Sequence, residues 1–453
     1  MTKDVIEEVA PFASCGPSLK RKAIEGTIWT FGAYGLGQVL RLLSNLLLTR
    51  LLFPEAFGVM ALVNVAIQGL AMFSDIGLGS SIIQNPRGEE PRFLRTAWTL
   101  QVARGLMLWA GTVIIAWPVA AFYEEPSLFK FLPVAGCSVF ISSFTTVNLF
   151  LANRKLQFAR MTLLGLISQV LTLAAMLAMA LQWRSVWALV AGTVVGSLVS
   201  TVLSYFLFPS PPMKFQFDRA AAHELFHFGK WIFVGTILGF IVTRLDRLVL
   251  GKFMTMSDLG VYSIAFMFAN VMPDVTRTIA AKVLFPVYSE TARNNPETLR
   301  KRTYKIRKYL MLVTLPPCIL LAAGGDLLID FLYDDRYVEA GWMLQVLAAG
   351  AIITTITAPI GGVFLAVGDS YGNTLYIGSK AVLTIAAMTI GGYTLGNNGI
   401  ILAIAAASLL HYPCIVMLVR RYDVWIPRLD FAALMLSTVL ALLGAYGIAL
   451  IQN

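Results

Sequence analysis

Residues 26–84 read GTIWTFGAYGLGQVLRLLSNLLLTRLLFPEAFGVMALVNVAIQGLAMFSDIGLGSSIIQ. Two long apolar runs are joined here by the short hinge Phe53-Pro54-Glu55. Each run exceeds the roughly 20 residues that an α-helix needs to cross the hydrocarbon core of a bilayer. The stretch therefore predicts two membrane-spanning helices, and similar apolar runs recur along the rest of the chain.

Both predicted helices also carry polar side chains at helical spacing, which places these side chains on one face of each helix. They are Tyr34, Gln38, Arg41 and Asn45 in the first helix, and Asn64, Gln68 and Asp75 in the second. An arginine at the membrane centre costs about 2.5–3.5 kcal/mol on insertion scales, so it persists where it faces a partner or a hydrated cavity. Two interpretations stay open: a structural ion pair or snorkelling arginine, and one wall of a polar pathway.

The composition is that of a membrane protein. Of the 453 residues, 57% are hydrophobic and only 13% are charged, and the mean hydropathy is +0.73. Soluble domains carry about 25% charged residues, so a soluble enzyme is excluded. Residues 1–19 lack the apolar core and cleavage site of a signal peptide, and the first span is expected to remain in the mature protein. The four isolated cysteines form no CxxC motif and indicate neither a zinc site nor a disulfide framework.

Thirteen spans are predicted, all of them helical, because the ten-residue alternation typical of membrane β-barrels does not occur. We expect a cytoplasmic N-terminal segment (1–25), a first group of six spans (26–208), a cytoplasmic amphipathic linker (209–228), a second group of six (229–419) and an additional helix (430–451). The individual spans are expected at about 26–50, 56–84, 94–122, 128–152, 158–181, 186–208, 229–251, 258–288, 309–329, 341–367, 372–394, 398–419 and 430–451.

Lysine and arginine gather in alternate connections between the spans. If the N-terminus is cytoplasmic, most of the 35 basic residues fall on the cytoplasmic side, as the positive-inside rule requires. The longest connection on the other side, residues 324–341, is acidic. This distribution predicts a cytoplasmic N-terminus, and it explains the net charge of +10 without a nucleic-acid partner.

An internal repeat links the two halves. LLLTRLLFPEAFGVMAL resembles LVLGKFMTMSDLGVYSI, so that Gly58 aligns with Gly260 at a shift of 202 residues. Six predicted spans separate the copies, an even number, and both halves therefore point the same way across the membrane. The repeat predicts two pseudo-symmetric six-helix lobes with the substrate site in the cleft between them.

Charged and amide residues also lie within later spans. They are Arg104 in the third span, Arg244, Asp246 and Arg247 in the seventh, Asn270, Asp274 and Arg277 in the eighth, and Lys380 in the eleventh. The excess of cations suits an anionic ligand such as a phosphate or pyrophosphate, which arginine binds through paired hydrogen bonds. Two alternatives stay open: Asp274 and Arg277 pair within their own helix, and Asp75 or Asp246 carries a proton or Na⁺. No cofactor or metal is expected beyond such a coupling ion.

Residues 223–227 spell HELFH, which matches the HExxH signature of zinc proteases. The motif lies in the predicted linker rather than in a span, and no acidic motif stands out as a third ligand. We therefore favour an interfacial amphipathic helix over a zinc site.

Several stretches together carry a resemblance to a known family. They are LLTRLLFPEAFGVMAL (47–62), DIGLGSSIIQ (75–84), AFYEEPSLFKFLPV (121–134), ANRKLQFAR (152–160), RLDRLVLGKFMTMSDLGVYSIAF (244–266), KVLFPVYSE (282–290), YVEAGWMLQVLA (337–348) and FLAVGDS (364–370). In their order and spacing they resemble the polysaccharide transporter family of the MOP flippase superfamily, the Wzx-type lipid-linked oligosaccharide flippases. The thirteenth span departs from the twelve-helix pattern of that family.

The resemblance implies an all-α, MATE-like pair of six-helix lobes in the bacterial cytoplasmic membrane, working by alternating access. It implies that an undecaprenyl-pyrophosphate-linked oligosaccharide crosses that membrane for exopolysaccharide, capsule or O-antigen assembly, alongside other polymerisation and export proteins. The cavity of such proteins is typically cationic.

On this hypothesis the chain binds and releases its substrate and breaks no bond, so it is not an enzyme. Its arginines would attract the pyrophosphate: Arg41, Arg244 and Arg247, with Arg104, Arg277 and Lys380 as further cations. Its uncharged polar residues would hydrogen-bond the sugars: Tyr34, Gln38, Asn45, Asn64, Gln68 and Asn270. The polyprenyl tail would stay among the membrane lipids. The alternatives are a multidrug exporter of the same superfamily and a membrane enzyme such as a polymerase, a ligase or an intramembrane protease.

Overall fold

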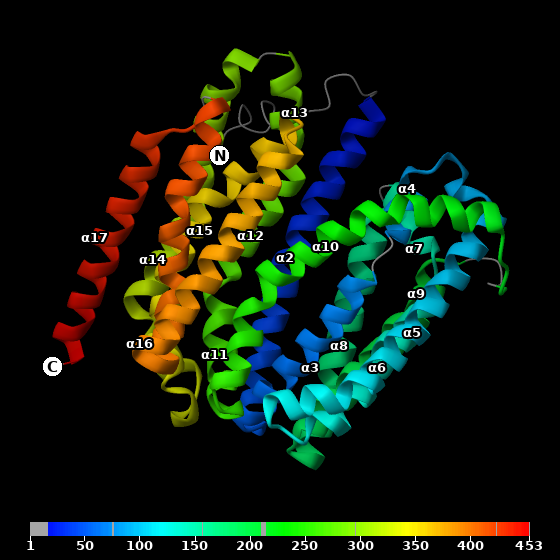
Figure 1. The fold of residues 1–453 in the computed structure, drawn as a ribbon, viewed down its shortest axis with the longest axis horizontal. Helices are drawn as coiled ribbons and strands as arrows, with labels where there is room; N and C mark the ends of the chain where they lie inside the picture. The colour runs from blue at the N-terminus through cyan, green and yellow to red at the C-terminus, as the bar shows by residue number, and fades with distance from the viewer. Residues whose placement is uncertain are drawn as a thin grey trace. The chain divides into compact units, whose positions relative to one another are not determined.

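A computed structural model describes residues 17–74, 77–155, 157–209, 214–294, 296–422 and 424–452, and the elements that it contains there are all helical (Figure 1). Eight of the described helices are long and apolar enough to cross a membrane, or up to ten if each of two bent pairs is one span. One of the eight covers two predicted spans. The first and seventh predicted spans are also helical but are not among these eight, and their helices carry more charged residues. The expected fold class, an all-α polytopic membrane protein, is confirmed.

The chain divides into two compact units, Cys15–Gly260 (the N-terminal unit) and Val261–Asn453 (the C-terminal unit). The N-terminal unit contains α2 (Pro17–Leu51), α3 (Pro54–Phe73), α4 (Leu78–Gln84), η1 (Pro86–Glu89), α5 (Pro91–Tyr123), α6 (Leu128–Ser143), α7 (Asn148–Arg154), α8 (Phe158–Trp183), α9 (Val186–Leu207) and α10 (Arg219–Phe253). The helix α11 (Met256–Ala269) begins in this unit and ends in the next.

The C-terminal unit continues with α12 (Val271–Ile279), a π-helical turn η2 (Ala280–Leu284), α13 (Phe285–Asn294), η3 (Pro296–Thr298), α14 (Leu299–Leu332), η4 (Asp335–Tyr337), α15 (Ala340–Ala366), α16 (Ser370–Val419), η5 (Arg420–Tyr422) and α17 (Pro427–Gln452). Two predicted spans, 372–394 and 398–419, both lie in α16. They are separated at Gly396, whose φ of 62° and ψ of −142° are not helical.

Three predicted spans are interrupted between separate helices, which corrects the sequence prediction, and a fourth, 309–329, is kinked at the non-helical residue Gly324. The second span stops at Phe73 and resumes as α4 after Gly77, a residue in the left-handed region that glycine adopts readily. The fourth breaks between α6 and α7 with a bend of 62°, and the eighth breaks at Asn270 with a bend of 44°. Average hydrophobicity does not reveal such breaks, because each interrupted stretch remains apolar enough overall to be predicted as one span.

The predicted linker helix is also not separate from the seventh span. It forms the first turns of α10, which runs without interruption from Arg219 to Phe253. Asp218 starts this helix by accepting a hydrogen bond from the amide of Ala220 (2.9 Å). Ala221 and Leu225 are fully buried in a hydrophobic cluster with residues of α4 and α5, so the apolar face of the linker docks on the N-terminal unit.

The first turns of α3 and α11 meet in a reciprocal contact that reproduces the sequence repeat. A Cβ atom added to Gly58 would lie 1.8 Å from the carbonyl oxygen of Met256, the first residue of α11. A Cβ added to Gly260 would lie 1.9 Å from the carbonyl oxygen of Pro54, the first residue of α3. The two contacts are equivalent in the repeat, because a shift of 202 residues turns Gly58 into Gly260 and Pro54 into Met256. The aligned glycines therefore bring the two helix backbones into direct contact.

The predicted additional helix is present as α17, which runs alongside α14 (Figure 1). Its outer face carries exposed apolar side chains, as expected of a helix in contact with lipid, whereas Asp430 near its start is only 2% exposed. The Asp430 carboxylate is bound there by Arg307 of α14, whose side chain is 0% exposed. A buried ion pair therefore connects the additional helix to the C-terminal unit.

Candidate functional site

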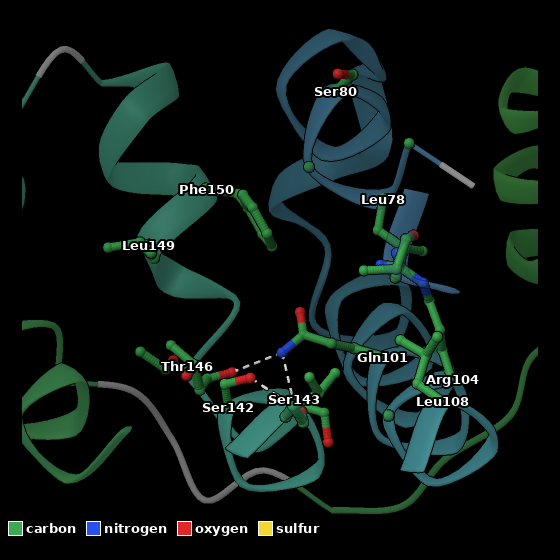
Figure 2. A pocket seen from close by; sticks show the side chains of 16 residues that line it. Leu78, Ser80, Gln101, Arg104, Leu108, Ser142, Ser143, Thr146, Leu149 and Phe150 are labelled. Atoms are coloured by element: carbon green, nitrogen blue, oxygen red, sulfur yellow. Dashed lines mark hydrogen bonds between the residues drawn. The ribbon is translucent and has the colours of Figure 1, made fainter. Parts of the chain in front are cut away.

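Two broken spans enclose a cavity in the N-terminal unit (Figure 2). Its volume is about 500 Å³, which lies within the usual range for small-ligand sites. Its wall comes from the end of α3, the start of α4, the middle of α5, the end of α6 and the start of α7. The lining residues are Ala71, Gly77, Leu78, Gly79, Ser80, Gln101, Arg104, Gly105, Leu108, Val139, Ser142, Ser143, Thr145, Thr146, Leu149 and Phe150.

Arg104 of α5 provides the positive charge in this wall. Its Nη2 donates a hydrogen bond to the carbonyl oxygen of Ala71 (2.6 Å), and its Nε donates to the hydroxyl of Ser74 (3.0 Å). Both acceptors lie where α3 ends, and a helix end leaves carbonyl groups without intrahelical partners. A cation there also complements the partial negative charge of the helix terminus. The break in the second span therefore determines where the Arg104 guanidinium is held.

Gln101, one turn before Arg104, also binds backbone carbonyl groups at a helix break, here the one between α6 and α7. Its Nε2 donates to the carbonyl oxygens of Ser143 (2.7 Å) and Thr145 (3.0 Å), which the interruption between α6 and α7 leaves without helical partners. The hydroxyl of Tyr205 donates to the intervening carbonyl of Phe144 (2.6 Å). An irregular backbone within a membrane needs such partners. Figure 2 shows Gln101 reaching from α5 toward Ser143.

Small residues let the helices around the cavity pack closely. A Cβ added to Gly105 would lie 2.3 Å from the side chain of Ser143, and one added to Gly136 would lie 2.1 Å from the hydroxyl of Thr112. These contacts bring α5 and α6 together. The cavity thus combines a guanidinium, an amide and several hydroxyls in an otherwise apolar wall, groups that suit an anionic or hydroxyl-rich ligand.

The C-terminal unit holds a second polar cluster, built from α12 and both parts of α16. Arg277 forms an ion pair with Asp274 (2.9 Å), so the predicted pairing within one helix is confirmed. Lys380 of α16 is half-buried. In the second half of α16, His411 is only 3% exposed, and its Nε2 lies 3.0 Å from the hydroxyl of Ser379. One of the predicted cations, Lys380, therefore lies next in sequence to the serine that binds this buried histidine.

The other predicted residues are distributed over several helices. Arg41 of α2 and Asn64 of α3 are exposed, whereas Gln38, Asn45 and Gln68 are half-buried. On α10, Asp246 is buried and the two arginines Arg244 and Arg247 are half-buried. Asn270 lies at the bend before α12, and its Nδ2 donates to the carbonyl of Phe266 (3.0 Å). The side chain of Tyr34 and the whole of Asp75 lie outside the described residues.

Of the predicted binding residues with described side chains, Arg104 lines the cavity in the N-terminal unit and the others do not. The amide, serine and threonine residues of that wall were not predicted as a site. Two signals in the sequence pointed to them: the polar run Ser142-Ser143-Phe144-Thr145-Thr146 within an apolar span, and Gln101 one turn before Arg104. The cleft that the repeat predicts between the two halves stays a prediction.

In the HExxH segment, the carboxylate of Glu224 is bound by neighbouring polar and basic side chains. The Glu224 carboxylate accepts hydrogen bonds from the Asn85 amide (2.8 Å) and the Arg87 guanidinium (2.8 Å), which also binds Glu90. The Asn85 amide, followed by Arg87, lowers the pKa of Glu224, so this carboxylate stays ionised at neutral pH. Within the described residues, no group of three His, Cys, Asp or Glu side chains could hold a metal ion. The geometry agrees with a docked interfacial helix.

Comparison with known proteins identifies the family. A family model described as "Polysaccharide biosynthesis protein" matches residues 47–341. The chain belongs to this family. It is 22% identical over 398 residues to the lipopolysaccharide biosynthesis protein WzxC of Escherichia coli (strain K12), a match that covers 87% of this chain and 80% of that protein. It is also 25% identical to the succinoglycan biosynthesis transport protein ExoT of Rhizobium meliloti (strain 1021), over 68% of this chain and 62% of that protein.

Solved structures share the fold of this polysaccharide biosynthesis family member. The lipid II flippase MurJ in an inward closed conformation matches with a TM-score of 0.71 at 14% identity, over 93% of this chain and 92% of that one. An inward-facing multidrug resistance MATE family transporter of the MOP superfamily matches with a TM-score of 0.65 at 14% identity, over 85% and 95%. At these identities the likeness shows only that the chain shares the fold of these two proteins.

Proposed function

We propose that this protein is a flippase that moves a lipid-linked oligosaccharide, with an undecaprenyl-pyrophosphate carrier, across the bacterial cytoplasmic membrane by alternating access. The observation that carries this proposal is the cavity at the two broken spans, where a fixed guanidinium lies among amide and hydroxyl groups. Guanidinium groups bind phosphate oxygens through charge-assisted hydrogen bonds. Hydroxyl and amide groups exchange hydrogen bonds with sugars. Membership of the polysaccharide biosynthesis family supports the same substrate class.

In this proposal the cavity of the N-terminal unit receives part of the polar headgroup. Arg104 approaches a phosphate while Ala71 and Ser74 hold its orientation, so little side-chain entropy is lost when the ligand binds. Ser142, Thr145 and Thr146 face the sugar. The polyprenyl chain remains in the lipid. Arg41, Arg244 and Arg247 stay candidates for further phosphate contacts, and Asp75 and Asp246 stay candidates for coupling to H⁺ or Na⁺. Proteins that polymerise and export the polysaccharide are the expected partners.

The test is reconstitution of the purified protein in liposomes with a labelled lipid-linked oligosaccharide, followed by measurement of its movement between leaflets. An Arg104→Ala variant is expected to move the lipid about 10- to 100-fold more slowly, because one hydrogen bond to a charged group contributes about 1.5–3 kcal/mol. Arg104→Lys keeps the charge but not the planar fork, and it should retain an intermediate rate.

Arg92 provides the matched control, since it lies on the same helix, is exposed and is far from the cavity lining. Arg92→Ala should transport at the wild-type rate. Thermal unfolding in detergent shows whether each variant is folded. A folded Arg104→Ala protein with an undiminished rate would remove the cavity from the mechanism, and a wild-type protein that moves no lipid-linked saccharide would overturn the proposed function. Movement of a cationic drug instead would indicate a multidrug exporter.

A further inference from the structure

A chain of polar contacts joins α14, α16 and α17 at one end of the C-terminal unit. The guanidinium of Arg307 in α14 lies 2.5 Å from the carboxylate of Asp430 in α17. The hydroxyl of Tyr412 in α16 donates to the other carboxylate oxygen (3.0 Å), and the indole of Trp425 donates to Tyr412 (3.3 Å). The guanidinium of Arg420 in η5 lies over the Trp425 ring, 5.0 Å from its centroid. These contacts hold the first turns of α14, the last turns of α16 and the start of α17 together.

Three exposed cations belong to the same end of the unit. Lys308 directly follows the buried arginine of α14, Arg428 lies in the first turn of α17, and Arg420 stacks on the indole. The buried arginine is neutralised by its partner in α17. Another carboxylate at the end of α16, that of Asp369, is paired with Arg421. The three exposed cations therefore give this surface an excess of positive charge.

The exposed faces of these helices change from charged to apolar within about one turn of the three cations. One turn toward the middle of each helix, the exposed side chain is Leu312 in α14, Phe431 in α17 and Met417 in α16. Exposed apolar faces of membrane helices contact acyl chains. Tyr304 and Tyr309, on either side of the exposed lysine in the sequence of α14, are exposed as well, and aromatic residues gather at the membrane–water interface. The three cations therefore lie at the level of the lipid headgroups.

We infer that Lys308, Arg420 and Arg428 bind the headgroup of an anionic phospholipid of the surrounding bilayer. Ammonium and guanidinium groups bind phosphate oxygens through charge-assisted hydrogen bonds, and the acyl chains lie along the exposed apolar faces of α14 and α17. An acidic protein would match the charge but not the apolar faces beside it. A bound phospholipid bridges two helices, so it stabilises the attachment of α17 to α14. None of these residues lines the cavity of the N-terminal unit, and the ligand is not the transported substrate.

The experiment titrates the full chain in a neutral detergent with phosphatidylglycerol, and with phosphatidylcholine of the same acyl chains as the uncharged comparison. Native mass spectrometry counts the bound lipids, and the thermal unfolding midpoint reports their effect on the fold. The wild type is expected to prefer phosphatidylglycerol and to unfold at a higher temperature in its presence. The double variant Lys308→Gln/Arg428→Gln should bind the tightest lipid about 30-fold more weakly, because each cation near an anionic membrane surface contributes a gain of about 5-fold. Both residues are exposed, so the variant should keep the wild-type midpoint without lipid.

The matched control is Arg92→Gln/Arg160→Gln, which removes two exposed cations near the starts of α5 and α8 in the N-terminal unit. It should keep the wild-type affinity and the wild-type rise in midpoint. Equal weakening in both double variants would show a general response to surface charge and overturn the site, as would equal stabilisation by phosphatidylcholine. Displacement of phosphatidylglycerol by an equal amount of undecaprenyl pyrophosphate would overturn the phospholipid as the ligand. These measurements use no oligosaccharide, so their outcome is independent of the proposed function.

Discussion

Replacing Asp430 by alanine is expected to destabilise the C-terminal unit by about 3–5 kcal/mol, because a buried arginine would lose its carboxylate. Nη2 of Arg307 lies 2.5 Å from Oδ1 of Asp430 and donates a second hydrogen bond to the carbonyl of Ile356 (2.9 Å). Among the described residues, Nε and Nη1 of Arg307 have no hydrogen-bond partner. Asp430 therefore offsets most of the cost of burying this guanidinium.

The same substitution should loosen α17. The hydroxyl of Tyr412 donates to Oδ2 of Asp430 (3.0 Å), and the indole of Trp425 donates to Tyr412 (3.3 Å). Asp430 thus joins α17 to α14 directly and to α16 through Tyr412. The measurement is thermal unfolding of the purified protein in detergent, together with the rate of proteolysis after residue 426, which should rise in Asp430→Ala.

Asp334 offers a matched control in the same unit. It also pairs with an arginine, Arg336, but its side chain is 43% exposed, so Asp334→Ala should cost at most about 1 kcal/mol. Replacing both members of the buried pair, as in Arg307→Met with Asp430→Leu, should recover much of the stability, since well-packed apolar residues often replace a buried pair at little cost. Equal stability of Asp430→Ala and Asp334→Ala would contradict this account of the pair.

Gly58→Ala and Gly260→Ala are expected to be the most damaging small substitutions in the N-terminal unit. Each adds one methyl group, but the added atom would lie within 2 Å of a backbone carbonyl oxygen of the opposite helix. A side chain could rotate away from such a clash, whereas the first turn of a helix must move as a whole. Overpacking costs typically 1–3 kcal/mol, and a backbone clash belongs at or above the top of that range.

Gly165 of α8 provides the control, because nothing lies within 4 Å of a Cβ added there. Gly165→Ala should leave the thermal unfolding midpoint unchanged or raise it slightly, as alanine favours the helix by about 1 kcal/mol over glycine. The midpoints of Gly58→Ala and Gly260→Ala should fall together, since the two contacts are reciprocal. A protein that tolerates either substitution as well as Gly165→Ala would show that the helices do not approach this closely.

The sequence by itself determined the class of the protein and the pattern of its helices. Hydrophobic runs of membrane length and few charges require an all-α polytopic fold. The repeat around Gly58 and Gly260 was readable because a close approach of two backbones permits only glycine, and that restriction leaves a mark in the sequence. Helical geometry offered the intrahelical pairing of Asp274 with Arg277 as one of the open alternatives, since both partners lie one turn apart, and the structure shows this pair.

Only the tertiary structure decided where the spans break and which polar residues meet there. The helix α3 ends at Phe73 and α4 begins after Gly77, and Arg104 from another helix binds the carbonyl of Ala71 at the end of α3. Gln101 and the carbonyls of Ser143 and Thr145 are more than 40 residues apart in sequence. His411 meets Ser379 only because Gly396 turns the chain back. Periodicity reports the face of one helix on which a residue lies, whereas these sites depend on contacts between helices, which no local pattern encodes.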